Sequence, residues 1–296
     1  MFTGLSAFPL TPFNEDRFDE AAHARLITRL VEAGVDSIGA LGSTGSYAYL
    51  DRDERRQVAR ASVRSAGGVP VVVGIGALRT SHVHALAEDA QQAGASAVLL
   101  APMSYQPLTD EDVFELYADV TARLSVPLVV YDNPVTTRFT FSTELYARIA
   151  VLPNVAAIKI PPVPLEANAA RERVEAIRAV VPDHVSIGVS GDGTAATGLN
   201  AGCQAWFSVV GGTLPEAVLP IVRAARQGDP GGALARSERL RPLWELFAAH
   251  GSLRVTAAIA EHLGLVSPSC LPRPLLGLSA SQREQVVRVV EKLHLS

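Results

Sequence analysis

The sequence predicts an α/β fold, a (β/α)8 TIM barrel followed by a C-terminal helical extension. Short apolar, β-branched runs alternate with longer amphipathic stretches as far as Val210, which is typical of strands and helices that build a parallel sheet. Eight such runs occur, and eight parallel strands close a barrel. Beyond Val210 only helical patterns continue. A count of strands does not exclude an open, doubly wound sheet, which is the alternative fold.

The expected elements follow one another along the whole chain. The strands are predicted at residues 4–8, 36–41, 69–75, 97–101, 127–131, 155–160, 184–190 and 205–210. Helices between them include residues 20–33, 52–66, 81–93, 111–124 and 142–152. Past the eighth strand, helices are predicted at residues 216–227, 232–250, 253–263 and 279–294. The expected division is a barrel of residues 1–224 and a helical extension of residues 225–296.

Composition excludes several classes of function. A chain of 296 residues with 48% hydrophobic residues can bury a large core, and its net charge of −4 offers no basic surface for nucleic acid. Its two cysteines, Cys203 and Cys270, have no nearby partner that would predict a disulfide framework or a zinc site. Neither a signal peptide nor a long uncharged apolar run is present. We therefore expect a cytoplasmic, membrane-free protein that acts on a small molecule without a metal.

Lys159 interrupts the apolar sixth strand near its C-terminal end, where barrels of this type build their active sites. Only one other lysine, Lys292, occurs in the chain, so arginine serves almost wherever a positive charge is needed. Arginine cannot lose its proton in a protein, whereas a lysine in an apolar pocket can become a nucleophilic amine. We predict that Lys159 forms a Schiff base with a 2-oxo acid. The alternative is a lysine that only extends to solvent.

Tyr131 ends the fifth expected strand, which neighbours the sixth in a barrel, so its phenol is expected beside Lys159. A hydroxyl group there can relay protons while the carbinolamine forms and loses water. An aromatic residue that only covers the rim of the core is the alternative interpretation.

Three loops that follow strands offer candidate contacts to substrate. The turn Gly-Ser-Thr-Gly at residues 42–45 can bind a carboxylate through backbone N–H groups and the hydroxyls of Ser43 and Thr44. Glycine-rich loops at residues 190–193 and 211–213 follow the seventh and eighth strands, where many barrels bind phosphate. Two alternatives therefore remain: a phosphorylated substrate bound by the glycine-rich loops, and a turn at residues 42–45 that has no binding role.

These residues together resemble the dihydrodipicolinate synthase and N-acetylneuraminate lyase family of class I aldolases. The resemblance spans nearly the whole chain and rests on residues 9–13, the Gly-Ser-Thr-Gly turn, Tyr-x-Asn-Pro at residues 131–134, Lys159, residues 190–192 and residues 273–275. It implies a Schiff base at Lys159 and proton transfer by Tyr131. It also implies that Ser43 and Thr44 hold the substrate carboxylate.

The same resemblance implies further properties of the site and of the assembly. Gly191 and the backbone near Phe207 would line the pocket, and no metal or organic cofactor would be required. The protein would be a homo-oligomer, either a dimer or a tetramer. Arg138, just past the fifth strand, is placed to contact a distal carboxylate or hydroxyl of the substrate, or else is a solvated loop residue.

Four departures from the family pattern bear on the reaction. Ser46 stands where a glutamate is usual, residues 160–162 read Ile-Pro-Pro where a polar pair commonly follows the lysine, and residues 211–212 are glycines where many members have an asparagine. Ser104 stands where synthases place a second tyrosine across the dimer interface, and Tyr105 lies one position later. Because condensation with aspartate semialdehyde uses that tyrosine, the pattern favours a different substrate.

The preferred function is a pyruvate-type lyase, an aldolase or dehydratase, acting on a 2-keto-3-deoxy sugar acid or a related oxo acid. A 4-hydroxy-tetrahydrodipicolinate synthase is the alternative of the same chemical class. A barrel that binds a 2-oxo acid or a phosphosugar without catalysis is the alternative of another class. Turnover of any 2-oxo acid would exclude the first of these binding barrels, whereas the phosphosugar barrel predicts phosphate-dependent affinity and a Lys159→Arg variant that keeps its function.

Overall fold

Eight parallel strands close into a barrel in the computed structural model, which describes residues 2–296. Around the barrel these strands follow their order in the sequence, and β1 closes the ring by pairing with both β4 and β10. The strands are β1 (Gly4–Ala7), β4 (Ser37–Ala40), β5 (Val71–Gly74), β6 (Ala97–Leu100), β7 (Leu128–Tyr131), β8 (Val155–Ile160), β9 (Ser186–Val189) and β10 (Ala205–Ser208). The predicted barrel is confirmed, and the open sheet is excluded.

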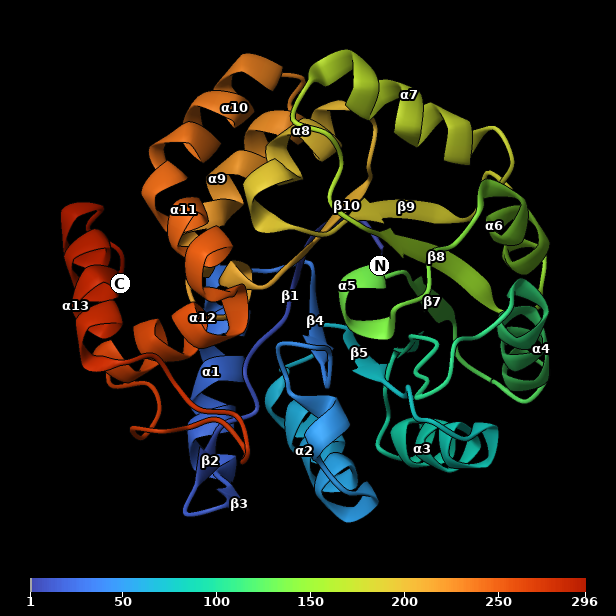
Figure 1. The fold of residues 1–296 in the computed structure, drawn as a ribbon, viewed down its shortest axis with the longest axis horizontal. Coiled ribbons are helices and arrows are strands. Elements are labelled where there is room, and N and C mark those ends of the chain that lie inside the picture. Colours follow the sequence, from blue (N-terminus) through green and yellow to red (C-terminus); the bar gives the residue numbers. More distant parts are fainter. Residues whose placement is uncertain (1) are drawn as a thin grey trace.

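Helices surround the strands (Figure 1). They are α1 (Glu20–Ala33), α2 (Arg52–Ser65), α3 (Thr80–Gln92), α4 (Asp110–Thr121), α6 (Thr143–Ala150), α7 (Ala167–Arg178), α8 (Ala195–Asn200) and α9 (Pro215–Arg226). Shorter elements lie in the connections: the hairpin β2 (Phe13–Asn14) and β3 (Arg17–Phe18), the turn of helix α5 (Pro134–Thr137), and the 3-10 turns η1 (Tyr47–Tyr49), η2 (Asp192–Thr194) and η3 (Val210–Gly212). Reciprocal side-chain capping begins α2 at Asp51 and α4 at Thr109.

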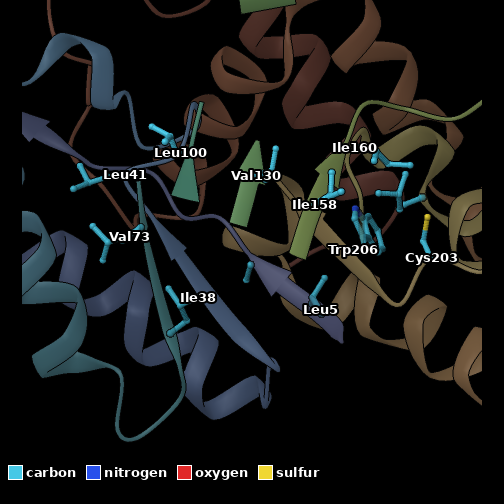
Figure 2. Close-up of a cluster of buried hydrophobic side chains, with 14 of the residues drawn as sticks. Leu5, Ile38, Leu41, Val73, Leu100, Val130, Ile158, Ile160, Cys203 and Trp206 are labelled. Atoms are coloured by element: carbon cyan, nitrogen blue, oxygen red, sulfur yellow. The ribbon is translucent and has the colours of Figure 1, made fainter. Parts of the chain in front are cut away.

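Side chains alternate between the two faces of each strand and build two separate cores. The outward-facing core packs between strands and helices, and Figure 2 shows Leu5, Ile38, Val130, Ile158 and Trp206 in it. A smaller core fills the barrel interior and consists of Phe8, Val72, Ala97, Leu99, Ala101, Val129, Tyr131, Ala157, Ala205 and Phe207. The interior is therefore packed rather than hollow, and only its C-terminal mouth is available for a site.

The C-terminal extension gathers on one side of the barrel (Figure 1). Its helices are α10 (Pro230–Arg239), α11 (Arg241–His250), α12 (Ser252–His262) and α13 (Ala280–Lys292). The prediction of one helix over residues 232–250 is wrong, because the chain breaks at Leu240. Pro242 explains the break, since proline has no N–H to donate and its ring collides with the carbonyl four residues earlier. The predicted boundary at residue 224 falls within α9, and the division into two units stays a prediction.

Among residues 2–296, none of the helices combines the length and the apolar character needed to cross a lipid bilayer.

Candidate active site

Lys159 points into the barrel from the C-terminal half of β8. Its neighbours in the strand, Ile158 and Ile160, pack outward against the helices (Figure 2). The lysine is 4% exposed, and its Nζ lies 4.0 Å from the ring centroid of Phe8 and 4.1 Å from that of Tyr131. The Phe207 ring centroid is 5.7 Å away. The amine is therefore enclosed mainly by aromatic carbon.

This enclosure governs the protonation of Lys159. Burial removes water from the ammonium and lowers the pKa of Lys159 below its ordinary value, while the nearby Tyr131 hydroxyl and the Asp192 carboxylate act in the opposite direction. The effect of burial is the largest of these. The uncharged, nucleophilic amine is consequently more accessible near neutral pH than it is for a surface lysine.

Tyr131 is the register partner of Lys159 across the β7–β8 pair. Its hydroxyl lies 3.2 Å from the Ser43 Oγ, which comes from the loop after β4. The amide Nδ2 of Asn133 donates to the Tyr131 hydroxyl at 2.8 Å and lies 3.4 Å from the Ser43 Oγ. Three polar side chains thus meet beside the buried amine, and the sequence named Asn133 only as part of Tyr-x-Asn-Pro, without a role in the site.

The turn that carries Ser43 and Thr44 lies between two residues with a strained backbone. Leu41 and Ser46 flank the turn with positive φ angles of 56° and 53°, which for residues other than glycine is a conformation that costs roughly 1–3 kcal/mol each. Close packing sustains it, because the Leu41 carbonyl oxygen lies 1.9 Å from where a Cβ on Gly74 would be. Thr44 is buried and Ser43 half-buried.

Phe8 forms one wall of the site, a role that the sequence argument missed. A Cβ on Gly39 or Gly42 would lie 2.3 Å or 2.5 Å from the Phe8 ring. These two glycines therefore make room for the ring that covers the Lys159 amine. Two glycines in and just after an otherwise apolar strand were the available signal, but they do not say which side chain uses the space.

Asp192 ties the loop after β9 to the end of β10. Its carboxylate accepts hydrogen bonds from Trp206 Nε1 at 3.0 Å, from Ser208 Oγ at 3.0 Å and from the backbone N–H groups of Val209 and Val210 at 3.2 and 2.9 Å. Burial raises the pKa of Asp192, and these donors oppose that rise. The bonds fix the loop that carries Gly191 against the strand that carries Phe207.

We expect Gly191→Ala to damage the site and Gly193→Ala to be tolerated. Gly191 has a φ of +85°, and a Cβ there would lie 2.4 Å from the Pro162 side chain. At Gly193 the nearest atom would lie at 3.5 Å, an ordinary contact. Thermal unfolding should show a loss of about 1–3 kcal/mol for Gly191→Ala alone, together with reduced turnover. Equal stability and turnover in the two variants would contradict this account of the loop.

Of the remaining candidate residues, one lies inside the barrel and two lie at its surface. Phe207 is buried, with its ring edge-on to Phe8 at 6.1 Å between centroids. Arg138 is exposed at the end of α5, and within residues 2–296 no hydrogen bond or ion pair holds its guanidinium. Tyr105 is 90% exposed. The structure therefore brings Lys159, Tyr131 and Phe207 together and leaves Arg138 and Tyr105 at the surface.

Metal ligands are not gathered anywhere in the part of the chain that the structure describes. Residues 2–296 contain no group of three or more His, Cys, Asp or Glu side chains placed to hold a metal ion. Cys203 and Cys270 are both buried and free. The prediction that the reaction needs no cofactor stays a prediction.

Asp132 lies between Tyr131 and Asn133 but faces outward. Its Oδ2 accepts a hydrogen bond from the Tyr146 hydroxyl at 2.5 Å, while its buried Oδ1 has no partner within residues 2–296. Burial raises the pKa of Asp132 from 3.8 to about 6. Its backbone N–H donates to the Lys159 carbonyl at 3.0 Å, so this carboxyl group lies directly behind the site.

This buried carboxyl predicts a pH-dependent change in stability. Because the folded state binds its proton more tightly than the unfolded state, Asp132 lowers stability as the pH rises from about 4 to above 6. We expect Asp132→Asn to remove that loss and to stabilise the protein by about 1–3 kcal/mol at pH 8, with little gain at pH 4. Urea unfolding at both pH values measures it, and an equal change at both would contradict the assignment.

Comparisons with known proteins identify the family of this chain. The model of the Dihydrodipicolinate synthetase family matches residues 1–293. A 4-hydroxy-tetrahydrodipicolinate synthase from Methylococcus capsulatus is 33% identical over 97% of this chain and 97% of its own length. The crystal structure of a dihydrodipicolinate synthase from Agrobacterium tumefaciens is 45% identical, with a TM-score of 0.94 over 99% of this chain and 98% of that one.

A crystal structure from Pseudomonas aeruginosa, described as a putative dihydrodipicolinate synthetase, is 28% identical with a TM-score of 0.90 over 99% of this chain and 100% of its own. The likeness therefore extends over the whole barrel and the C-terminal helices. The chain belongs to the dihydrodipicolinate synthetase family and is a Schiff-base-forming lyase.

Proposed function

We propose that Lys159 forms its imine with pyruvate and that Tyr131 transfers the protons. The observation that carries this proposal is the buried Nζ, which lies 4.1 Å from the ring of its register partner Tyr131. Burial lowers the pKa of Lys159 and so favours the free amine that must attack the 2-oxo carbon. Ser43 and Thr44 are proposed to hold the pyruvate carboxylate, with Gly191 and Phe207 lining the same pocket.

Three proton transfers convert pyruvate into its enamine on Lys159. The Lys159 amine attacks the 2-oxo carbon, and a proton passes from nitrogen to oxygen through the Tyr131 hydroxyl to give the carbinolamine. Tyr131 then gives its proton to the carbinolamine hydroxyl, which leaves as water while the nitrogen lone pair forms the iminium double bond. The resulting phenolate takes a proton from the methyl carbon, and the electrons of that bond neutralise the iminium as an enamine.

The enamine carbon is the nucleophile for bond formation. It attacks the carbonyl carbon of an aldehyde, the aldehyde oxygen takes a proton from Tyr131, and water then releases the product from Lys159. The same steps in reverse cleave a 3-deoxy-4-hydroxy-2-oxo acid. None of these steps uses a metal or an organic cofactor.

We propose that the aldehyde is aspartate semialdehyde and that the activity is that of a 4-hydroxy-tetrahydrodipicolinate synthase. Relatives over the full length of the chain carry this name at 30–33% identity, among them the proteins from Methylococcus capsulatus and Halorhodospira halophila. Their support favours this activity over the sugar-acid lyase that the departures at Ser104 and residues 160–162 suggested.

A 2-keto-3-deoxy sugar acid is the second candidate substrate, and one observation favours it. Ser104 has no phenol at the position where the resemblance places a second tyrosine, and Tyr105, one position later, is 90% exposed in the single chain. Arg138, also exposed beside the mouth, would then contact a distal carboxylate or hydroxyl of the sugar acid. A homo-oligomer is proposed for either substrate.

Two assays on the same preparation separate these candidates. Condensation is measured with pyruvate and aspartate semialdehyde, and cleavage or dehydration is measured as the loss of 2-keto-3-deoxy acids of five and six carbons. We expect turnover in the first assay to exceed that in the second by at least about 100-fold in kcat/KM. The reverse ratio would replace the synthase with the sugar-acid lyase and leave the imine chemistry intact.

A further inference from the structure

We propose that Asn133 is a positioning residue of the proton relay, because its amide stabilises the Tyr131 phenolate through a hydrogen bond within the same chain. This inference rests on the proposed function, since it assigns a role in the proton transfers of the pyruvate imine. The juxtaposition that carries it is the Asn133 Nδ2, which lies 2.8 Å from the Tyr131 hydroxyl and 3.4 Å from the Ser43 Oγ.

The backbone places the Asn133 side chain on the face of the site. Residues 131 and 133 lie two positions apart in an extended segment, so both side chains point inward while Asp132 points outward to Tyr146. The Asn133 carbonyl accepts hydrogen bonds from the Thr136 N–H and from the Thr137 Oγ1, both at 3.0 Å. These bonds from the first turn of α5 hold the backbone of Asn133 in place.

The Asn133 side chain does not cap the helix that it precedes. It occupies the N-cap of α5, where an asparagine side chain normally accepts a hydrogen bond from the first turn and contributes about 0.5–2 kcal/mol. No such side-chain bond is present at this cap. Asn133 instead directs its amide toward the Tyr131 hydroxyl, an arrangement that a purely structural cap does not require.

The hydrogen bond has a fixed direction. An amide NH2 group only donates, so the Tyr131 oxygen accepts from Asn133 and must send its own proton elsewhere. The acceptors in reach are the Ser43 Oγ at 3.2 Å and the group that reacts at Lys159. Asn133 thereby orients the phenolic proton toward the reaction.

The hydrogen bond from Asn133 is strongest while Tyr131 is a phenolate. After Tyr131 has protonated the departing carbinolamine hydroxyl, its oxygen carries a full negative charge until it removes the methyl proton of the iminium. A donor at 2.8 Å to a charged oxygen makes a stronger hydrogen bond than the same donor makes to the neutral phenol. Asn133 therefore raises the fraction of Tyr131 that is phenolate beside the iminium, and because this is the form that removes the methyl proton, enamine formation is faster while the total amount of imine is unchanged.

Its position within the chain also compensates for a departure noted above. The resemblance places a second tyrosine at the position of Ser104, where this chain has no phenol, and Tyr105 lies one position later. Asn133 supplies a second polar contact to Tyr131 without a residue from another subunit.

The test uses variants that match asparagine in shape. Asn133→Leu removes the donor, and Asn133→Asp replaces it with an acceptor, while Asn200→Leu removes a remote amide that donates to the Pro230 carbonyl on the outer helices. For each variant, intact mass after borohydride gives the fraction of chains that hold pyruvate as an imine at equilibrium. Proton NMR in D2O gives the rate at which deuterium enters the pyruvate methyl group.

We expect both Asn133 variants to keep the equilibrium imine within about twofold of the parent and to exchange deuterium roughly 10- to 100-fold more slowly. Asn200→Leu should exchange like the parent. Exchange at the parental rate in either Asn133 variant, or a parallel loss of imine and exchange in both, would overturn the inference. Asn133→Asp decides the matter if Asn133→Leu does not fold. A parent protein that forms no imine would overturn the proposed function itself.

Discussion

Replacing Lys159 with arginine should lower kcat/KM by at least about 10³-fold and leave the barrel folded. Arginine keeps the positive charge but cannot lose a proton, so it cannot attack the 2-oxo carbon. Its stem of three methylene groups still packs among the rings of Phe8, Tyr131 and Phe207, which surround the lysine amine in the parent. Steady-state kinetics with pyruvate and aspartate semialdehyde, together with thermal unfolding, measure the two parts of this expectation.

The chain contains its own matched control for this substitution. Lys292 is the only other lysine and is exposed at the end of α13, so Lys292→Arg should change neither kinetics nor stability. Parental activity in Lys159→Arg would mean that the residue supplies charge alone. If instead neither the parent nor the variant turned over a 2-oxo acid, a barrel that binds a phosphorylated ligand through its glycine-rich loops would become the better account.

Removing the hydroxyl of Tyr131 should have the next largest effect. Tyr131→Phe keeps the ring 4.1 Å from the Lys159 Nζ but loses the contacts to Ser43 at 3.2 Å and Asn133 at 2.8 Å. Because positioned general acids and bases typically contribute 10²- to 10⁴-fold, we expect kcat to fall roughly 10²- to 10³-fold. The KM for pyruvate should stay within about threefold, since the carboxylate contacts remain.

A tyrosine away from the site controls for the loss of a hydroxyl. Tyr49 is 49% exposed, and Tyr49→Phe should retain parental kcat. If Tyr131→Phe raised the KM for pyruvate and left kcat unchanged, Tyr131 would bind substrate rather than transfer protons.

Much of the fold follows from the sequence because a barrel imposes regular rules. Alternating strands and helices predict it, and each strand then has known neighbours, so the sequence alone places Tyr131 and Lys159 side by side. The scarcity of lysine identified the amine, since a chain that prefers arginine keeps lysine where a proton must be lost.

Other parts of the site depend on contacts that no sequence pattern reveals. The Phe8 ring covers the amine only because Gly39 and Gly42 leave it room. The direction of the Asn133 amide is equally hidden, because asparagine before a helix predicts a cap rather than a bond to Tyr131. Pro242, by contrast, was visible in the sequence and should have divided the helix expected at residues 232–250.

The residues of this chain and the names of its relatives favour different substrates. Ser104 and the apolar residues after Lys159 suggested a sugar acid, whereas the names of full-length relatives support the synthase. Both activities begin with the same imine, so the shared chemistry does not separate them. We propose that side chains at the barrel mouth, such as exposed Arg138, select the aldehyde partner, and hydrophobic periodicity does not predict where such side chains lie against a bound substrate.

The most direct test of the central claim is intact-mass spectrometry after the protein is incubated with pyruvate and reduced with borohydride. We predict a single adduct of one reduced pyruvate per chain, mapped by peptide analysis to Lys159 and absent from Lys159→Arg. An adduct on Lys292 or on the N-terminal amine alone, or no adduct with pyruvate and longer 2-oxo acids, would contradict the Schiff-base assignment of Lys159.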